Sequence, residues 1–119
     1  MTEVNVMGIW TGKAGDHNPQ SSVQVETTVN RIFYEIRHDS KQQEKRIVQI
    51  FVDGEQVETH HDWLSTDGKE TNFFDIPAKF QVSGTHKVMF KVFEPETGAA
   101  DAKEGELVCI SPVFELIYF

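Results

Sequence analysis

RIVQIFVDGEQV, residues 46–57, contains the pattern that decides the fold. Its first half carries two interleaved apolar sets, one at Val48, Ile50 and Val52 and the other at Ile47 and Phe51. A period of two residues predicts a β-strand, because successive side chains of a strand point to opposite faces. Asp53-Gly54 follows, and this dipeptide favours a tight hairpin turn. The stretch therefore predicts two antiparallel strands, with the set that begins at Val48 facing the core.

The same alternation recurs along most of the chain, and no stretch shows helical spacing over three turns. The expected strands cover residues 4–10, 23–29, 32–37, 46–52, 56–63, 71–76, 85–93 and 107–119. Turn-forming or polar residues separate them, in a loop at 11–22, a polar loop at 39–45, a second hairpin turn at Asp67-Gly68 and a long loop at 94–106. A shift of the apolar register near Asn30 indicates a bulge or a corner. Seven or eight short strands predict an all-β antiparallel sandwich that forms one domain over residues 1–119.

Three stretches of the chain resemble known families. GTHKVMFKVFEPETG, residues 84–98, resembles the penultimate strand of immunoglobulin-like and fibronectin type III-like domains, with His86 at the place of their corner tyrosine. IFVDGEQV, residues 50–57, is similar to the hairpin in the middle of such domains. The layout of residues 67–98 also resembles the fungal immunomodulatory proteins. This second resemblance implies a fibronectin III-like sandwich with lectin-like activity and an N-terminal dimerisation helix.

Composition and charge exclude several function classes. The chain has 39% hydrophobic and 25% charged residues, which is typical of a folded globular domain, and its formal net charge is -8. This acidic balance argues against nucleic-acid binding, which needs a basic face. The single Cys109 excludes an intrachain disulfide. We see neither a secretory signal nor a membrane-spanning apolar run, so we expect a cytoplasmic protein; secretion by a non-classical route and a phage or viral origin stay open.

The main functional prediction is a non-enzymatic module that binds a protein partner, or a second copy as a homodimer. Four apolar side chains fall on the faces opposite the expected core, at Ile47, Phe51, Met89 and Phe93, and Phe73 is a further candidate. Such a face is an interface in many proteins, although a wrong choice of inner face or a covering loop explains it equally well. The neighbouring loop supplies carboxylates at Glu94, Glu96, Asp101 and Glu104. These acidic side chains favour a basic partner.

A second hypothesis is a lectin-like module that stacks a sugar on Trp10 and Trp63. The same loop carboxylates would help to bind the glycan, with or without calcium. The alternative for both tryptophans is that they cap the ends of the sandwich core.

A third hypothesis is a small metal-dependent enzyme around His60 and Asp62. On a strand, His60 and His61 point to opposite faces, so only His60 and Asp62 share one, and His38 or His86 would supply a third ligand. We predict instead no metal, no cofactor and no catalytic residue. His86 is expected to be half-buried and to donate to a backbone carbonyl, with a pKa lowered by burial that makes it a pH sensor. Cys109 is expected to pack in the sheet, in surroundings that disfavour the thiolate.

Overall fold

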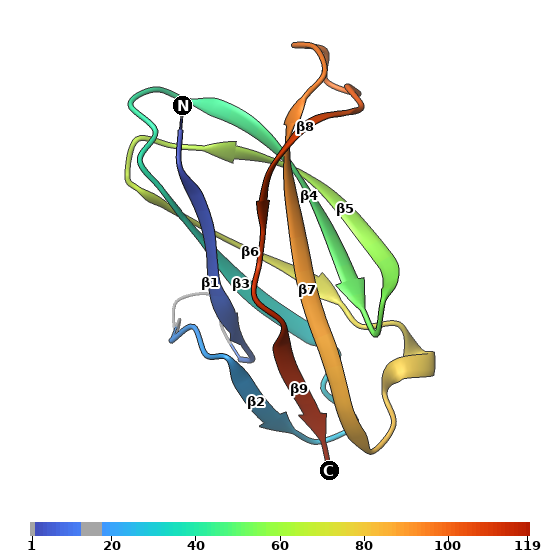
Figure 1. The fold of residues 1–119 in the computed structure, drawn as a ribbon. Coiled ribbons are helices and arrows are strands. Elements are labelled where there is room, and N and C mark those ends of the chain that lie inside the picture. Colours follow the sequence, from blue (N-terminus) through green and yellow to red (C-terminus); the bar gives the residue numbers. More distant parts are fainter. Residues whose placement is uncertain (1, 13–17) are drawn as a thin grey trace.

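The computed structural model, which describes residues 2–12 and 18–119, contains two β-sheets packed face to face (Figure 1). Sheet A has the strand order β1–β3–β6, formed by Val4–Trp10, Arg31–His38 and Lys69–Asp75. Sheet B has the order β2–β9–β7–β4–β5, formed by Ser22–Val25, Phe114–Tyr118, Gly84–Pro95, Glu44–Val52 and Glu55–Leu64. β8, Glu104–Ile110, also pairs with β7, and a short 3-10 helix, η2, covers Ala78–Phe80. The predicted all-β sandwich is confirmed.

The core lies between the two sheets. Val48, Ile50 and Val52 are fully buried in the main hydrophobic cluster, so the predicted inner face of this strand is confirmed. Sheet A contributes Ile32 and Tyr34, among others, from β3. Full burial of an aliphatic side chain stabilises the fold by roughly 1.5–3 kcal/mol. The residues that alternate in the sequence therefore supply the side chains that pack between the two sheets.

The described residues form nine strands rather than seven or eight, because the expected strand at 107–119 is divided in two. β8 ends at Ile110 and β9 begins at Phe114, with Pro112 between them. Proline has no N–H group to donate to a sheet. Ser111 supplies the hydrogen bonds to β7 at this break. Its N–H donates to the Phe90 carbonyl, and its hydroxyl accepts from the Phe90 N–H at 2.9 Å. The two strands thus continue along the same edge of β7.

One connection and one strand pairing differ from the prediction. Asp67-Gly68 is not a hairpin turn, since β5 pairs with β4 whereas β6 pairs with β3 in the other sheet. The register shift near Asn30 is a corner, one of the two predicted alternatives, where the chain passes from β2 in sheet B to β3 in sheet A. β2 also pairs with β9 in parallel, while the other strand pairs are antiparallel. Residues 13–17 of the expected loop at 11–22 lie outside the described residues.

The N-terminal segment forms strand β1, where the resemblance to the fungal proteins implies a dimerisation helix. Val4 and Val6 pack in the core, and a bulge follows between Val6 and Gly8. Alternating apolar residues at this position suit a half-buried strand and not a helix. The predicted strand over residues 4–10 is therefore confirmed, and the helix implied by the resemblance to the fungal proteins is not found there.

Candidate binding face

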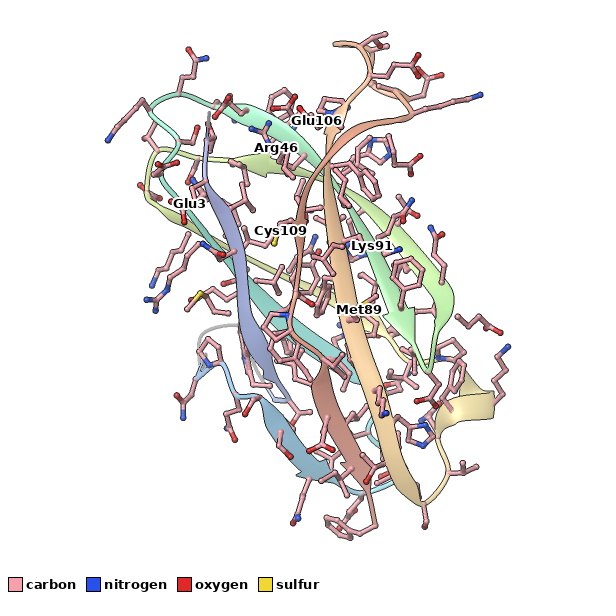
Figure 2. All side chains as sticks on the ribbon, in the orientation of Figure 1. Glu3, Arg46, Met89, Lys91, Glu106 and Cys109 are labelled. Atoms are coloured by element: carbon pink, nitrogen blue, oxygen red, sulfur yellow. The ribbon has the colours of Figure 1, made fainter. Side chains whose placement is uncertain are left out.

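The four predicted partner-binding apolar residues lie together on the side of sheet B that points away from the core. Ile47 on β4 pairs with Phe93 on β7, and Phe51 pairs with Met89. Figure 2 shows Met89 and Lys91 along β7. By the register of the neighbouring strands, three exposed side chains join them from β5 and β8. We call this set the outer apolar face: Ile47, Phe51, Trp63, Met89, Phe93, Leu107 and Ile110.

Burial varies strongly across the outer apolar face. Ile47 is fully buried, and the other three predicted residues are half-buried. Trp63 and Ile110 are each 56% exposed, and Leu107 is 43% exposed. The face therefore has a packed centre, formed by β4 and β7, and an exposed apolar border on β5 and β8.

Two lysines lie against aromatic rings of this face. The Lys91 ammonium group lies 5.0 Å from the centre of the Phe51 ring, and that of Lys45 lies 6.0 Å from the Trp63 ring. Lys45 Nζ also donates to the carbonyl of Ala100 at 2.9 Å. Each lysine thus places its ammonium group within cation–π distance of an aromatic ring of the face.

The acidic loop, residues 94–106, lies beside the outer apolar face and is a folded turn. The Glu96 N–H donates to the Lys103 carbonyl at 2.8 Å, and Lys45 attaches the tip to β4. Glu96, Asp101 and Glu104 are exposed, while Glu94 is half-buried. The pKa of Glu104 is below its usual value, because its own backbone N–H and the Gln49 side chain donate to the carboxylate. The loop thus presents ionised carboxylates at the rim of the face.

His60 and Asp62 share a face of β5, as predicted, but they meet the hydroxyl of Tyr34. His60 Nδ1 lies 2.7 Å from the Tyr34 oxygen, and the hydroxyl donates to Asp62 Oδ2 at 2.9 Å. Asn72 donates to Asp62 Oδ1 at 2.7 Å. Burial, followed by the charge of Asp62, holds the pKa of Tyr34 well above its usual value. The three side chains therefore form a polar bridge between the two sheets.

The histidines expected to supply a third metal ligand have other partners. His38 Nε2 lies 2.9 Å from Glu70, and His86 Nδ1 lies 2.7 Å from Asp53. Within residues 2–12 and 18–119, no group of three or more His, Cys, Asp and Glu side chains is arranged to hold a metal ion. The ligand set of the third hypothesis, His60 and Asp62 with His38 or His86, is therefore not brought together among these residues.

His86 donates to a backbone carbonyl as predicted, with Nε2 at 3.0 Å from the oxygen of Val82, but its pKa shifts in the opposite direction. Burial alone lowers the pKa, and the Val82 carbonyl and Asp53 carboxylate outweigh it, so the pKa lies above its usual value. The sequence pattern indicated that His86 is buried, but it did not indicate the contact between His86 and Asp53. For Cys109, burial raises the pKa of the thiol, in agreement with the predicted sheet-packing role.

The two tryptophans do not form a common platform. Trp10 is 2% exposed and stacks on Phe33 in sheet A, with the ring centres 5.8 Å apart. Trp63 is exposed on sheet B. The expected pair of stacking residues is therefore reduced to Trp63, because Trp10 has no free face of comparable size.

A polar cavity of about 450 Å³ opens at one end of the sandwich, and sequence reasoning missed it. Arg46 lines it with a side chain that is only 5% exposed (Figure 2). Its Nη2 lies 3.7 Å from Glu44 and 3.9 Å from Glu94. The signal was present in the sequence, since Arg46 is in phase with Val48 and Ile50 and must point inward. The flanking carboxylates compensate its charge.

Comparisons with known proteins identify the fold. No family model and no curated protein matches the chain. Among solved structures, a crystal structure of the CARDB domain of a Pyrococcus furiosus protein in complex with di-metal ions is similar, with a TM-score of 0.54 and 11% identity over 100% of this chain and 88% of that one. A solution NMR structure of the same domain is also similar, with a TM-score of 0.53 and 13% identity over 98% of this chain and 94% of that one. The chain is thus an immunoglobulin-like β-sandwich.

Within the described part of the chain, no helix has the length and apolar character needed to cross a membrane.

Proposed function

We propose that the chain is a non-enzymatic interaction module that docks a basic protein on its outer apolar face. The observation that carries this proposal is the exposed apolar border formed by Trp63, Leu107 and Ile110 around a packed centre. Aromatic residues are enriched in interfaces, and tryptophan, tyrosine and arginine are enriched among the residues that contribute most to binding. Trp63 is therefore the residue that we expect to contribute most to binding.

The charge beside the face determines the kind of partner. The chain carries a formal net charge of -8, and the acidic loop places Glu96, Asp101 and Glu104 at the rim. A second copy would bring the same negative charge to the interface. A partner with lysine or arginine side chains instead gains attraction and faster association. We therefore propose that the partner is a different protein with a basic surface.

The comparison with the CARDB domain supports the fold and assigns no activity, since sandwiches of this kind carry many functions. The metal ions of that crystal structure belong to that protein. Among the described residues, several polar side chains that could do chemistry are engaged with one another. Tyr34, His60 and Asp62 bond across the sheets, and His86 bonds to Asp53. The proposal accordingly includes no catalytic step and no cofactor.

The test uses a labelled synthetic peptide of alternating lysine and leucine residues, with a glutamate–leucine peptide as the charge-reversed control. We expect fluorescence anisotropy to show binding of the basic peptide alone. Trp63→Ser and Leu107→Ser should weaken it about tenfold or more, because truncating an anchor residue costs roughly 2 kcal/mol. Phe73→Ser is the matched control, since Phe73 is 38% exposed on sheet A. It should leave the affinity unchanged.

Further measurements on the same variants distinguish a basic protein from other binding partners. Light scattering should give a monomer; a dimer that Trp63→Ser dissociates would place a second copy on the face and contradict the basic partner. Equal peptide affinity of all variants would show that the peptide binds at a different site. Binding to a glycan array that depends on Trp63 but not on Leu107 would favour the lectin-like alternative, for which the exposed Trp63 ring is the one supporting observation.

A further inference from the structure

Both ring nitrogens of His86 face groups that accept hydrogen bonds. Nδ1 lies 2.7 Å from Asp53 Oδ2, and Nε2 lies 3.0 Å from the carbonyl oxygen of Val82. An ionised carboxylate and a carbonyl group only accept. A neutral imidazole has one N–H and can satisfy one of the two, whereas the imidazolium form satisfies both. The arrangement is therefore complete only when His86 is protonated.

Asp53 connects this ring to the backbone of β7. Its Oδ1 accepts from the Lys87 N–H at 2.8 Å, and its own N–H donates to the Lys87 carbonyl at 2.8 Å. Asp53 has a φ of 51°, in the left-handed region that the tight β4–β5 turn requires. One residue thus holds the turn to β7 through two backbone-directed contacts and one contact to a titratable ring.

The surroundings of the ring isolate this pair. His86 is 8% exposed, and the rings of Phe80 and Tyr118 pack edge-on against it at 6.1 and 5.7 Å. Other charged groups lie on the adjoining elements. Glu55 on β5, after the turn, pairs with Lys79 of η2 at 2.6 Å. Lys87 on β7 and Glu115 on β9 are register partners with exposed side chains, and the Lys87 charge acts on Asp53. Among the described residues, Asp53 is the one charged group that contacts the ring.

We propose that His86 and Asp53 form a protonation-dependent latch that fastens the β4–β5 turn and the segment after η2 to the start of β7. Figure 1 shows that this turn and η2 lie side by side. The latch is closed when His86 is charged, and it loosens when the ring loses its proton. Phe51 lies two residues before Asp53 and pairs with Met89, so the latch also fixes one end of the outer apolar face. That link to binding rests on the proposed function, whereas the latch does not.

The sign of the effect follows from the two pKa directions. The pKa of His86 is above its usual value, so the latch is fully closed below about pH 6.5 and opens as the pH rises through the folded-state pKa. Burial alone would raise the pKa of Asp53, but the Lys87 N–H and His86 lower it below its usual value, so Asp53 stays ionised down to more acidic pH. The closed state therefore occupies the mildly acidic range.

NMR between about pH 5 and 9 tests the latch, because this range brackets the titration of histidine. We follow the His86 ring signals and the hydrogen-exchange protection factors of the Asp53 and Lys87 amides. We expect both protection factors to fall with the ring titration, while Glu96, whose N–H bonds to Lys103 in the acidic loop, keeps its protection. In His86→Gln the pH dependence should disappear. His61→Gln, a change at an exposed histidine, should retain it.

Two results would overturn the latch, and both come from the wild-type protein, so they do not require a folded variant. They are a His86 ring that titrates below the usual histidine value, and amides of Asp53 and Lys87 that stay equally protected at alkaline pH. The peptide assay repeated at both ends of the range separates the two proposals. Equal affinity at both ends would remove the link to the face, and absence of binding at every pH would contradict the proposed function alone.

Discussion

The Tyr34 hydroxyl donates to Asp62 at 2.9 Å and so joins the central strand of sheet A to the edge strand of sheet B. Tyr34 is fully buried, and its ring also packs against Phe90 at 4.8 Å. β5 pairs with β4 alone among the described strands, which leaves its other edge unpaired. Inward-pointing charged residues protect such edges against strand addition. Asp62 therefore both completes the bridge and discourages strand addition along β5.

Tyr34→Phe should destabilise the fold by about 1–3 kcal/mol, because it removes the donor to a partly buried carboxylate and the neighbour of His60. Urea unfolding followed by circular dichroism measures the change. Tyr118→Phe is the matched control, since the Tyr118 hydroxyl makes one neutral bond to the Val29 carbonyl at 2.6 Å. It should cost about 1 kcal/mol. If Tyr34→Phe costs no more than Tyr118→Phe, the bridge has no special role.

Gly8→Ala should cost roughly 1–3 kcal/mol, the range for forced overpacking. A Cβ atom at Gly8 would lie 2.6 Å from the backbone nitrogen of Gln20 and 2.7 Å from its oxygen. These two groups form the bridge between Ile9 and Gln20, so the backbone cannot move away without losing it. Gly98→Ala, where no atom lies within 4 Å of the new Cβ, should be close to neutral. Equal thermal stability of the two variants would contradict the close approach at Gly8.

Glu70 should contribute stability that is lost in acid. Burial alone would raise its pKa, but His38 and the N–H and hydroxyl groups of Ser65 bring it below the usual value. A lowered folded-state pKa means that the contribution is present above about pH 4.5 and disappears as the pH falls through the folded value. The free energy of unfolding should therefore depend less steeply on pH in Glu70→Gln than in the wild type below that pH. The same dependence of the unfolding free energy on pH in Glu70→Gln and the wild type would contradict the contribution of Glu70.

Cys109 should react slowly with a disulfide reagent such as dithionitrobenzoate. Burial raises the pKa of its thiol, and the thiolate is the reacting form. We expect a rate well below that of free cysteine at pH 8 in the native protein and full reaction once urea unfolds it. A native rate equal to that of free cysteine would show that the thiol is exposed, in contradiction to its packing against the core.

The period-two pattern was sufficient to predict the faces of individual strands. It separated Val48, Ile50 and Val52 from the outward set, and it placed His60 and Asp62 on one side of their strand. These features depend on neighbouring residues of one strand, which a local pattern records directly.

The contacts between strands lay beyond such a pattern. Tyr34 and Asp62 are 28 residues apart, and His86 and Asp53 are 33 apart, on segments that only the topology brings together. The burial of Trp10 against Phe33 has the same origin, as does the passage between sheets at Asp67-Gly68. A histidine's pKa depends on such distant partners, which explains why burial alone gave the wrong direction for His86.

Ile47→Ala tests whether the centre of the outer apolar face is packed as tightly as the core. Ile47 points away from the main cluster but is 0% exposed, since Phe93 and the neighbouring strands cover it. Truncation of a buried isoleucine costs roughly 2–5 kcal/mol, because it removes transfer free energy and leaves a cavity. Leu107→Ala, at a side chain 43% exposed on the same face, should cost less than about 1 kcal/mol. Urea unfolding distinguishes the two. A small loss for Ile47→Ala would mean that the centre of the face is loose in solution and too mobile to present Trp63 as a fixed anchor.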